Sequence, residues 1–396
     1  MKNFKFHQTT HIVFGSGEIK GLGKITGEYG NKALLVTTSA SIPALRDQYE
    51  RIKKILTDEG LEITHFDKVI PNPTTDTIKE GAALARKNRC NVIIGLGGGS
   101  SMDTAKAISV EATHEGGCWD YLFYKTPQPD PDKLLPVIAV STTSGTGSQV
   151  TQVAVVTNTR ERDKSALYNN ILYPKVCIID PELMTSVPKF VTATTGFDVL
   201  CHAFESTIHP NTGVYVDLLA WEAIEIVVKT LPALLRDLSD VEKRQKMAWA
   251  DTLGGLCIAN AGVTLPHGMG MAIGGMYPHV AHGEALAIVY PAFAAFTWKS
   301  AVPQFARLAR IINPELDTVS NEEAAFNSVH EISGFIESLG LLKQLKDINM
   351  PEVEIGALAK QSMVLPDYKN NPRVASASEM ADLVKTSYYK LDKSPS

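Results

Sequence analysis

The sequence passes from a strand pattern to a helix pattern within residues 92–106, VIIGLGGGSSMDTAK. An apolar run typical of strands buried on both faces leads into three consecutive glycines, and a helical stretch follows. Glycines at such a turn let the backbone approach a pyrophosphate, and the helix N-terminus offers free N–H groups. A tight turn without a ligand would also use glycines, and Asp103 could be a helix stabiliser or a ligand partner, so both interpretations stay open here.

The same alternation of strand and helix extends through the first half of the chain. Helical stretches such as 78–87 and 102–111 lie between the strand-like runs. The continuously apolar runs occupy residues 33–36, 92–96, 137–140 and 176–179. This alternation predicts a doubly wound α/β domain with a largely parallel sheet.

The second half of the chain has a different pattern, which begins near Pro181. Strand-like runs almost vanish, and long stretches with a 3.6-residue period replace them. These stretches cover residues 217–237, 242–261, 285–297, 304–312, 322–339 and 376–389. We therefore predict an α/β domain over residues 1–182 and an all-helical domain over residues 183–396.

A second polar and glycine-rich stretch, STTSGTGSQVT at residues 141–151, follows the strand predicted at 137–140. Hydroxyls and backbone amides at the carboxyl end of a strand suit a phosphate, a ribose or an amide. A polar capping loop is the alternative. Two such loops at the ends of parallel strands favour a shared ligand.

Residues 194–202, TTGFDVLCH, predict the start of a helix, with Thr194, Thr195 and Gly196 as capping residues. Asp198 and His202 are four residues apart, so a helix places the carboxylate and the imidazole on one face. A surface pair would show the same spacing.

A second histidine-containing stretch, residues 266–285, holds His267, His279 and His282. Pro266 favours the first turn of a helix, which places His267 near a helix start. One carboxylate with two or three imidazoles suits a divalent transition metal. Composition and spacing alone leave the alternatives open.

Composition limits the classes of function. The net charge of −5 and the pI near 6.1 give no electrostatic signature for nucleic acid or an anionic membrane. No apolar run reaches the roughly 18 residues of a membrane span, and the N-terminus lacks the apolar core of a signal peptide. Five scattered cysteines without a CxxC pair fit a reducing cytoplasm.

The sequence resembles the iron-containing (group III) alcohol dehydrogenase family over essentially its whole length. The motifs that carry the resemblance are GGGSSMD at 97–103, TTSGTGSQVT at 142–151, DPELMTSVP with TGFDVLCHAFE at 180–205, and LPHGMGMAIGGMYPHVAHGEALAIVYP at 265–291. The resemblance implies a dinucleotide-binding α/β domain and a helical catalytic domain, as in dehydroquinate synthase-like proteins.

The resemblance also implies a divalent metal held by one aspartate and three histidines. The matching positions are Asp198, His202, His267 and His282. Oxygen and nitrogen ligands suit Fe²⁺, and Zn²⁺ also fits them.

The cofactor implied by the resemblance is NAD or NADP. The three glycines and Ser100 would bind the pyrophosphate, the threonines of the second loop would line the nicotinamide side, and Lys164 would reach a ribose. The assigned residues are Thr38, Asn72, Gly97, Gly98, Gly99, Ser100, Asp103, Thr142, Thr143, Thr146, Thr151 and Lys164.

The chain departs from the family pattern at four positions. Met271 stands where a second histidine is common, and His279 lies in a turn one residue longer than usual. Gln149 replaces a glutamate, and Thr38 replaces an aspartate that reaches the adenosine ribose. Because Met271 carries no exchangeable proton, we expect His279 to supply part of the proton transfer. The alternative is that His279 is a surface histidine of a loop and that the proton comes from solvent through the ribose hydroxyls.

We therefore predict a cytoplasmic, metal-dependent NAD(P) alcohol dehydrogenase that works as an aldehyde reductase on a small substrate. We expect a homodimer or a higher homo-oligomer, with no nucleic-acid or membrane partner. The alternatives are a hydroxyacid–oxoacid transhydrogenase, a dehydroquinate synthase-like lyase, and a non-enzymatic scaffold or nucleotide sensor.

Overall fold

The structure, a computed structural model, describes residues 2–41 and 43–389. These residues form two compact units. The sheet unit comprises residues 7–188 and 238–248, and the helical unit comprises the described parts of 1–6, 189–237 and 249–396. A compact unit need not be an independently folding domain, so the boundary after residue 182 stays a proposal.

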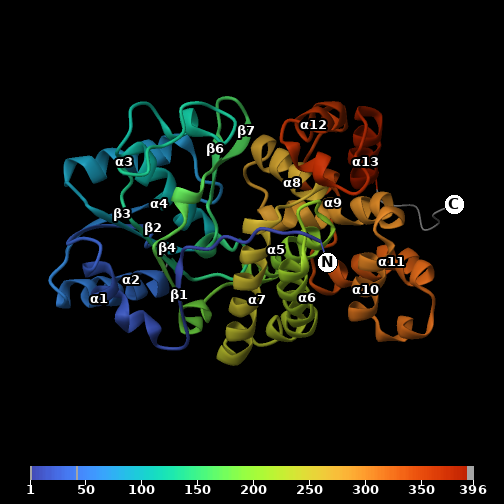
Figure 1. Ribbon diagram of the computed structural model, residues 1–396, viewed down its shortest axis with the longest axis horizontal. Coiled ribbons are helices and arrows are strands. Elements are labelled where there is room, and N and C mark those ends of the chain that lie inside the picture. The colour runs from blue at the N-terminus through green and yellow to red at the C-terminus, as the bar shows by residue number, and fades with distance from the viewer. Residues whose placement is uncertain (1, 42, 390–396) are drawn as a thin grey trace. The chain divides into compact units, whose positions relative to one another are not determined.

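Six strands of the sheet unit form one parallel sheet in the order β1-β8-β5-β4-β2-β3. Figure 1 labels four of them, β1, β2, β3 and β4. The strands are β1 (His11–Phe14), β2 (Lys32–Thr38), β3 (Glu62–Val69), β4 (Val92–Gly97), β5 (Val137–Ser141) and β8 (Val176–Ile179). All four apolar runs of the sequence lie in this sheet, as predicted. The predicted α/β fold is confirmed.

The helices of the sheet unit pack on both faces of the sheet. They are α1 (Leu22–Gly27), α2 (Pro43–Asp58), α3 (Thr75–Lys87) and α4 (Gly99–Glu111). Alternate residues of β2 enter two separate apolar cores: Leu34 packs with residues of α3 and α4, and Leu35 packs with residues of α1 and α2. Burial on both faces explains why these strands lack a polar alternation.

The connections that follow β2 and β4 run in opposite directions across the sheet. From β2 the chain crosses to its outer neighbour β3, whereas β4 lies on the other side of β2, and β5 and β8 follow beyond it. A topological switch point therefore lies between β2 and β4. Open α/β sheets bind ligands outside the carboxyl ends of their strands at such a point.

An antiparallel hairpin, β6 (Val153–Asn158) with β7 (Asp163–Tyr168), was not predicted. Its strands follow directly after the 141–151 loop and contain polar residues among the apolar ones. This mixed composition hid the strands, although β6 contacts α4 and β7 pairs with β6.

The helical unit contains no strand among its described residues. Its long helices are α5 (Lys189–Ile208), α6 (Val214–Leu234), α7 (Val241–Asn260, which begins in the sheet unit), α8 (Leu265–Met276), α9 (His282–Thr297), α10 (Val302–Ile312), α11 (Asn321–Ser338), α12 (Ile355–Gln361) and α13 (Ala377–Tyr389). The predicted all-helical character is confirmed.

Short 3₁₀ helices complete the described chain. They span Glu18–Gly21, Cys118–Tyr121, Ser148–Val150, Asn170–Leu172, Pro181–Met184, Trp298–Ser300, Pro314–Thr318, Leu345–Ile348, Glu352–Glu354 and Pro366–Asn370. No single described helix has the length and apolar character to cross a membrane, and one bent pair, α7 with α8, meets the criterion only jointly.

The predicted start of the helix at Thr194 is wrong, because α5 begins at Lys189. The Thr194 hydroxyl donates to the Phe190 carbonyl at 3.0 Å, and the Thr195 hydroxyl donates to Val191 O at 2.8 Å. These bonds to the preceding turn satisfy the hydroxyls inside a helix. Gly196 is also interior, where a Cβ would come within 2.6 Å of Leu231 on α6.

Candidate metal centre and cofactor site

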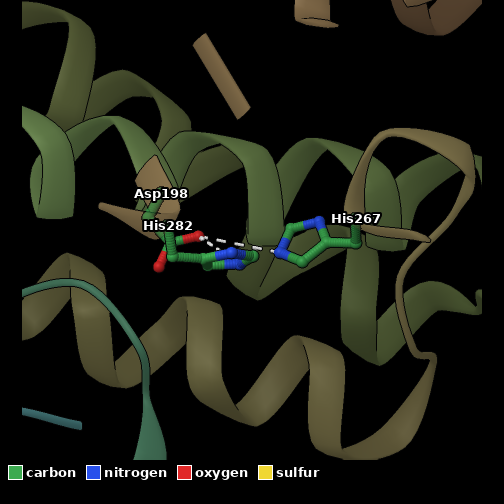
Figure 2. A group of neighbouring side chains, drawn as sticks. All are labelled: Asp198, His267 and His282. Carbon is green, nitrogen blue, oxygen red and sulfur yellow. Dashed lines mark ion pairs between the residues drawn. The ribbon is translucent and has the colours of Figure 1, made fainter. Parts of the chain in front are cut away.

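Three imidazoles converge on one carboxylate oxygen in the helical unit. From Asp198 Oδ1, the Nε2 atom lies at 3.5 Å for His202, 3.6 Å for His267 and 3.8 Å for His282. Figure 2 shows His267 and His282 with their rings turned toward Asp198. The sequence-predicted ligand set is therefore one cluster in space.

Three helices and one close-packed glycine build this cluster. Asp198 and His202 lie one turn apart on α5, whereas His267 lies in the first turn of α8 and His282 begins α9. A Cβ at Gly283 would lie 1.9 Å from the Thr194 carbonyl oxygen, so only glycine lets the start of α9 approach α5 this closely.

Glu205 holds the His267 ring in its orientation. Its Oε1 lies 2.7 Å from His267 Nδ1, and its Oε2 accepts from the backbone N–H and the hydroxyl of Thr264 at 2.8 and 3.2 Å. With Nδ1 donating to Glu205, Nε2 is the ring atom that faces Asp198, and it could bind a metal once it has lost its proton. Carboxylate-oriented histidines of this kind are a regular feature of metal sites.

Glu205 was not among the predicted site residues. It lies three residues after His202 and seven after Asp198 on α5, so the helical period places all three on one face. This spacing was the signal that could have found it.

The electrostatics of the cluster favour charge on Asp198 and His267 when no metal is bound. Burial alone would raise the pKa of Asp198, but the neighbouring histidines lower it to about 2. Burial alone would lower the pKa of His267, but the carboxylates of Glu205 and Asp198 raise it to about 10. Burial raises the pKa of the nearby Asp367 to about 7, opposed by His267 and assisted by Glu205.

The cluster fits a single cation. One ligand atom each from Asp198, His267 and His282 lie within 4.8 Å of one another. Asp198 Oδ1 and His267 Nε2 are both buried and have no hydrogen-bond partner in the described structure. Buried polar atoms without partners are costly, and a cation between them would satisfy both. Oxygen and imidazole nitrogen suit a divalent transition metal.

His279 lies outside the cluster. Its side chain is exposed, its Nε2 atom lies 3.3 Å from the Ile348 carbonyl oxygen, and its ring meets Tyr277 edge-on. Met271, which stands where a histidine was expected, is buried in α8. The proton-transfer role assigned to His279 stays a prediction.

The two glycine-rich loops of the sheet unit lie against each other. A Cβ at Gly98 would approach the Thr143 hydroxyl to 2.9 Å, and a Cβ at Gly99 would approach Thr146 Cγ2 to 2.5 Å. Gly97 has a φ of 147°, which side chains rarely adopt. These glycines therefore form a backbone cradle at the start of α4, next to the switch point, where a pyrophosphate would fit.

Two charged residues of α4 clamp the second loop. Asp103 accepts from Ser148 Oγ at 2.6 Å and from the Val155 N–H at 3.1 Å. Buried Lys106 donates to the backbone carbonyls of Ser148, Thr151 and Val153 at 2.7–2.8 Å. Asp103 thus bonds to protein groups, and Lys106 is a positioning residue that sequence reasoning missed.

The other predicted cofactor residues fall near these loops or at the ends of strands. The ammonium of Lys164 donates to Asn72 Oδ1 at 2.8 Å, and Asn72 itself has a positive φ of 55°. Thr38 ends β2, where its hydroxyl lies 2.9 Å from the Tyr49 phenol oxygen. Ser100 lies in the first turn of α4, Thr142 follows β5 and Thr151 precedes β6.

Comparison with known proteins decides the family. The model of iron-containing alcohol dehydrogenases matches residues 9–181, and the C-terminal model of the Fe-containing alcohol dehydrogenase family matches residues 192–388. The chain belongs to the iron-containing alcohol dehydrogenase family. It is a NAD-linked oxidoreductase of this type, and the rival transhydrogenase and lyase activities are not favoured.

The similarity extends over nearly the full length of this alcohol dehydrogenase. It is 36% identical to a choline dehydrogenase of Bacillus subtilis over 93% of this chain and 92% of that protein. It is 30% identical to an NAD-dependent methanol dehydrogenase of Bacillus methanolicus over 94% and 97%. Among solved structures, an archaeal halo-thermophilic alcohol dehydrogenase from a Red Sea brine pool superposes with a TM-score of 0.92, at 32% identity over 98% of this chain and 100% of that one.

Proposed function

We propose that this alcohol dehydrogenase interconverts a small aldehyde and its alcohol at a divalent metal, Fe²⁺ or Zn²⁺, held by Asp198, His202, His267 and His282. The observation that carries the proposal is the convergence of three imidazole Nε2 atoms on Asp198 Oδ1. Two of these atoms, Asp198 Oδ1 and His267 Nε2, are buried without a hydrogen-bond partner. When bound, such a metal supplies Lewis-acid polarisation of a substrate oxygen.

The protein groups around the cluster have separate tasks. Asp198 offsets the positive charge and draws the three rings to one point. Glu205 fixes the tautomer of His267 and the direction of its Nε2 atom. The low exposure of Asp198, His202 and His267 keeps water away and strengthens their electrostatic interactions.

We propose that the glycine cradle and the 141–151 loop bind NADH or NADPH, which supplies the hydride. Gly97, Gly98, Gly99 and Ser100 would contact the pyrophosphate through backbone amides at the start of α4. Thr142, Thr143, Thr146 and Thr151 would line the nicotinamide side, with Lys164 and Asn72 at a ribose. Thr38 would lie at the adenosine ribose, and the Asp103–Lys106 clamp keeps the loops in place.

We also propose a cytoplasmic location and a homodimer or higher homo-oligomer. All five cysteines are free and buried, which suits a reducing compartment. β1 is an edge strand of the sheet, so it offers backbone groups to a second chain. Light scattering of the purified protein would measure the oligomeric state, and a monomer at micromolar concentration would contradict this part.

The test of the proposed reaction uses the Fe²⁺-reconstituted protein with a panel of aldehydes and each reduced cofactor. Because relatives are named for choline and methanol, the oxidation panel includes both alcohols. Turnover of free NADH or NADPH is expected, whereas a transhydrogenase would recycle a bound nicotinamide and consume neither.

Metal content tests the ligand set directly. His267→Ala and His282→Ala should lower metal occupancy in elemental analysis and abolish turnover. His330→Ala is the matched control, since His330 is an exposed histidine of α11 outside the cluster. Full occupancy in His282→Ala would show that another group takes its place.

A further inference from the structure

The carboxyl end of β2 carries a pair of hydroxyls rather than a carboxylate. Thr38 Oγ1 lies 2.9 Å from the hydroxyl of Tyr49, a buried residue of α2. In this contact one hydroxyl donates its proton to the other oxygen, so only one of the two O–H protons is used. The other is left over, so the pair can donate one hydrogen bond to a ligand at the switch point between β2 and β4.

A second hydroxyl contact identifies the face of the sheet involved. The Thr37 hydroxyl donates to Thr38 O at 2.8 Å, so its 2.8 Å contact with His65 Nε2 requires the histidine to donate. The His65 ring also lies edge-on to Tyr49, with ring centroids 5.9 Å apart. His65 on β3 therefore faces α2, on the same side of the sheet as Thr37.

Asp67 lies two residues after His65 on β3. Ile63 and His65 face α2, and Phe66 enters the opposite core. The pairing with β2 shifts register just beyond Phe66, so Asp67 lies in a bulge of β3, and its carboxylate acts electrostatically on both Tyr49 and His65, which are on the α2 face. β3 runs parallel to β2, with Leu35 opposite His65 and Thr38 opposite Val69. Asp67 thus lies beyond His65, toward the edge where Thr38 ends β2.

The electrostatics agree with this placement. Burial raises the pKa of Tyr49, and the Asp67 carboxylate adds to the rise against the hydroxyls of Thr38 and Thr37. Burial and the Lys53 ammonium lower the pKa of His65, while Asp67 and Glu50 act in the opposite direction. The Asp67 carboxylate is half-buried and has no hydrogen bond or ion pair among the described residues.

We infer that Asp67, from the strand next to Thr38, supplies the carboxylate that makes this dehydrogenase prefer NADH to NADPH. The inference rests on the proposed cofactor site. A carboxylate accepts a hydrogen bond from a ribose 2′-hydroxyl and repels a 2′-phosphate. The Thr38–Tyr49 pair donates to either substituent, so it binds both cofactors, and the charge on Asp67 discriminates between them.

The test measures binding, independently of turnover. Quenching of protein fluorescence gives dissociation constants for NADH and NADPH, and competition with 2′,5′-ADP and with ADP isolates the adenosine end. Asp67→Asn removes the charge and retains the shape. The matched control is Glu62→Gln, which removes a charge from the opposite end of β3.

Asp67→Asn should bring the dissociation constants of NADPH and NADH closer by about tenfold, as expected for one charge near a phosphate dianion in a water-accessible site. Binding of 2′,5′-ADP should improve relative to ADP, with Glu62→Gln near the wild type. Circular dichroism checks that both variants are folded.

Two results would overturn the inference alone. One is an unchanged preference in folded Asp67→Asn, and the other is an equal shift in Glu62→Gln, which would indicate a general charge effect. Failure of the wild-type protein to bind either cofactor or either adenine nucleotide would instead overturn the proposed cofactor site.

Discussion

Replacing Glu205 with glutamine tests whether this residue prepares His267 for a metal. The carboxylate now serves three donors: Oε1 meets His267 Nδ1 at 2.7 Å, and Oε2 accepts from the Thr264 N–H and hydroxyl. A glutamine has one acceptor oxygen and one NH₂ group. If its oxygen stays with His267, its NH₂ group faces the N–H of Thr264, so two donors meet and the Thr264 N–H loses its acceptor.

The size of the effect follows from this geometry. A buried amide donor left without an acceptor costs about 1–3 kcal/mol of stability. Loss of a charged partner behind a metal-binding histidine typically lowers metal affinity by about 10–100-fold, which is about 1.4–2.7 kcal/mol. The Glu205→Gln protein should therefore fold less stably and bind metal more weakly, with the ligand atoms all retained.

Chelator competition measures the metal dissociation constant, and thermal unfolding of the metal-free protein measures stability. Glu222→Gln, on an exposed position of α6, is the matched control for the same chemical change. Unchanged metal affinity in Glu205→Gln would refute the reasoning, because it would show that the His267 ring is oriented without its carboxylate partner.

Three further predictions concern pH, the cofactor and the proton. The pKa of His267 is about 10 in the metal-free fold, above its unfolded value of about 6.5. Metal binding to His267 must therefore displace a proton, so metal affinity measured by titration should rise with pH up to about 10. By the same linkage the His267 proton stabilises the metal-free fold below about pH 6.5, and this contribution fades toward pH 10. Thr38→Asp should weaken NADPH binding far more than NADH binding, and equal effects on both would remove Thr38 from cofactor choice. If His279 transfers a proton, His279→Gln should remove one limb of the kcat–pH profile and lower kcat by about 10²–10⁴. An unchanged profile would show that solvent supplies the proton and that the His279 ring only contacts Ile348.

The sequence predicted those parts of the molecule that depend on local period. Leu34 and Leu35 lie in buried strands with no polar alternation, so the apolar run was sufficient evidence for β2. Asp198 and His202 share a helical face, and Pro266 lies in the first turn of α8, as their local patterns predicted. The assignment of the four metal ligands came from the family resemblance and stays a prediction.

The parts that were missed depend on contacts distant in sequence. Thr194 looked like a capping residue because its hydroxyl can serve a helix start, but inside α5 the same hydroxyl bonds back to Phe190. The role of Glu205 depends on Thr264 and His267, which lie about 60 residues away. The orientation of the His279 ring likewise depends on Ile348, 69 residues away in the sequence, and its role in proton transfer stays a prediction.

Lys106 shows how such distant contacts join the two sequence motifs of the proposed cofactor site. Burial lowers the pKa of Lys106 to about 8 and raises that of Asp103, and the charge on each opposes the shift of the other. The hydrogen bonds of both side chains are made with residues 148–155. Removing either side chain would leave its buried hydrogen-bonding partners in residues 148–155 unsatisfied, at a cost of about 1–3 kcal/mol for each. The helix that begins at the glycine cradle therefore also fixes the threonine loop, so a change in either motif is transmitted to the other.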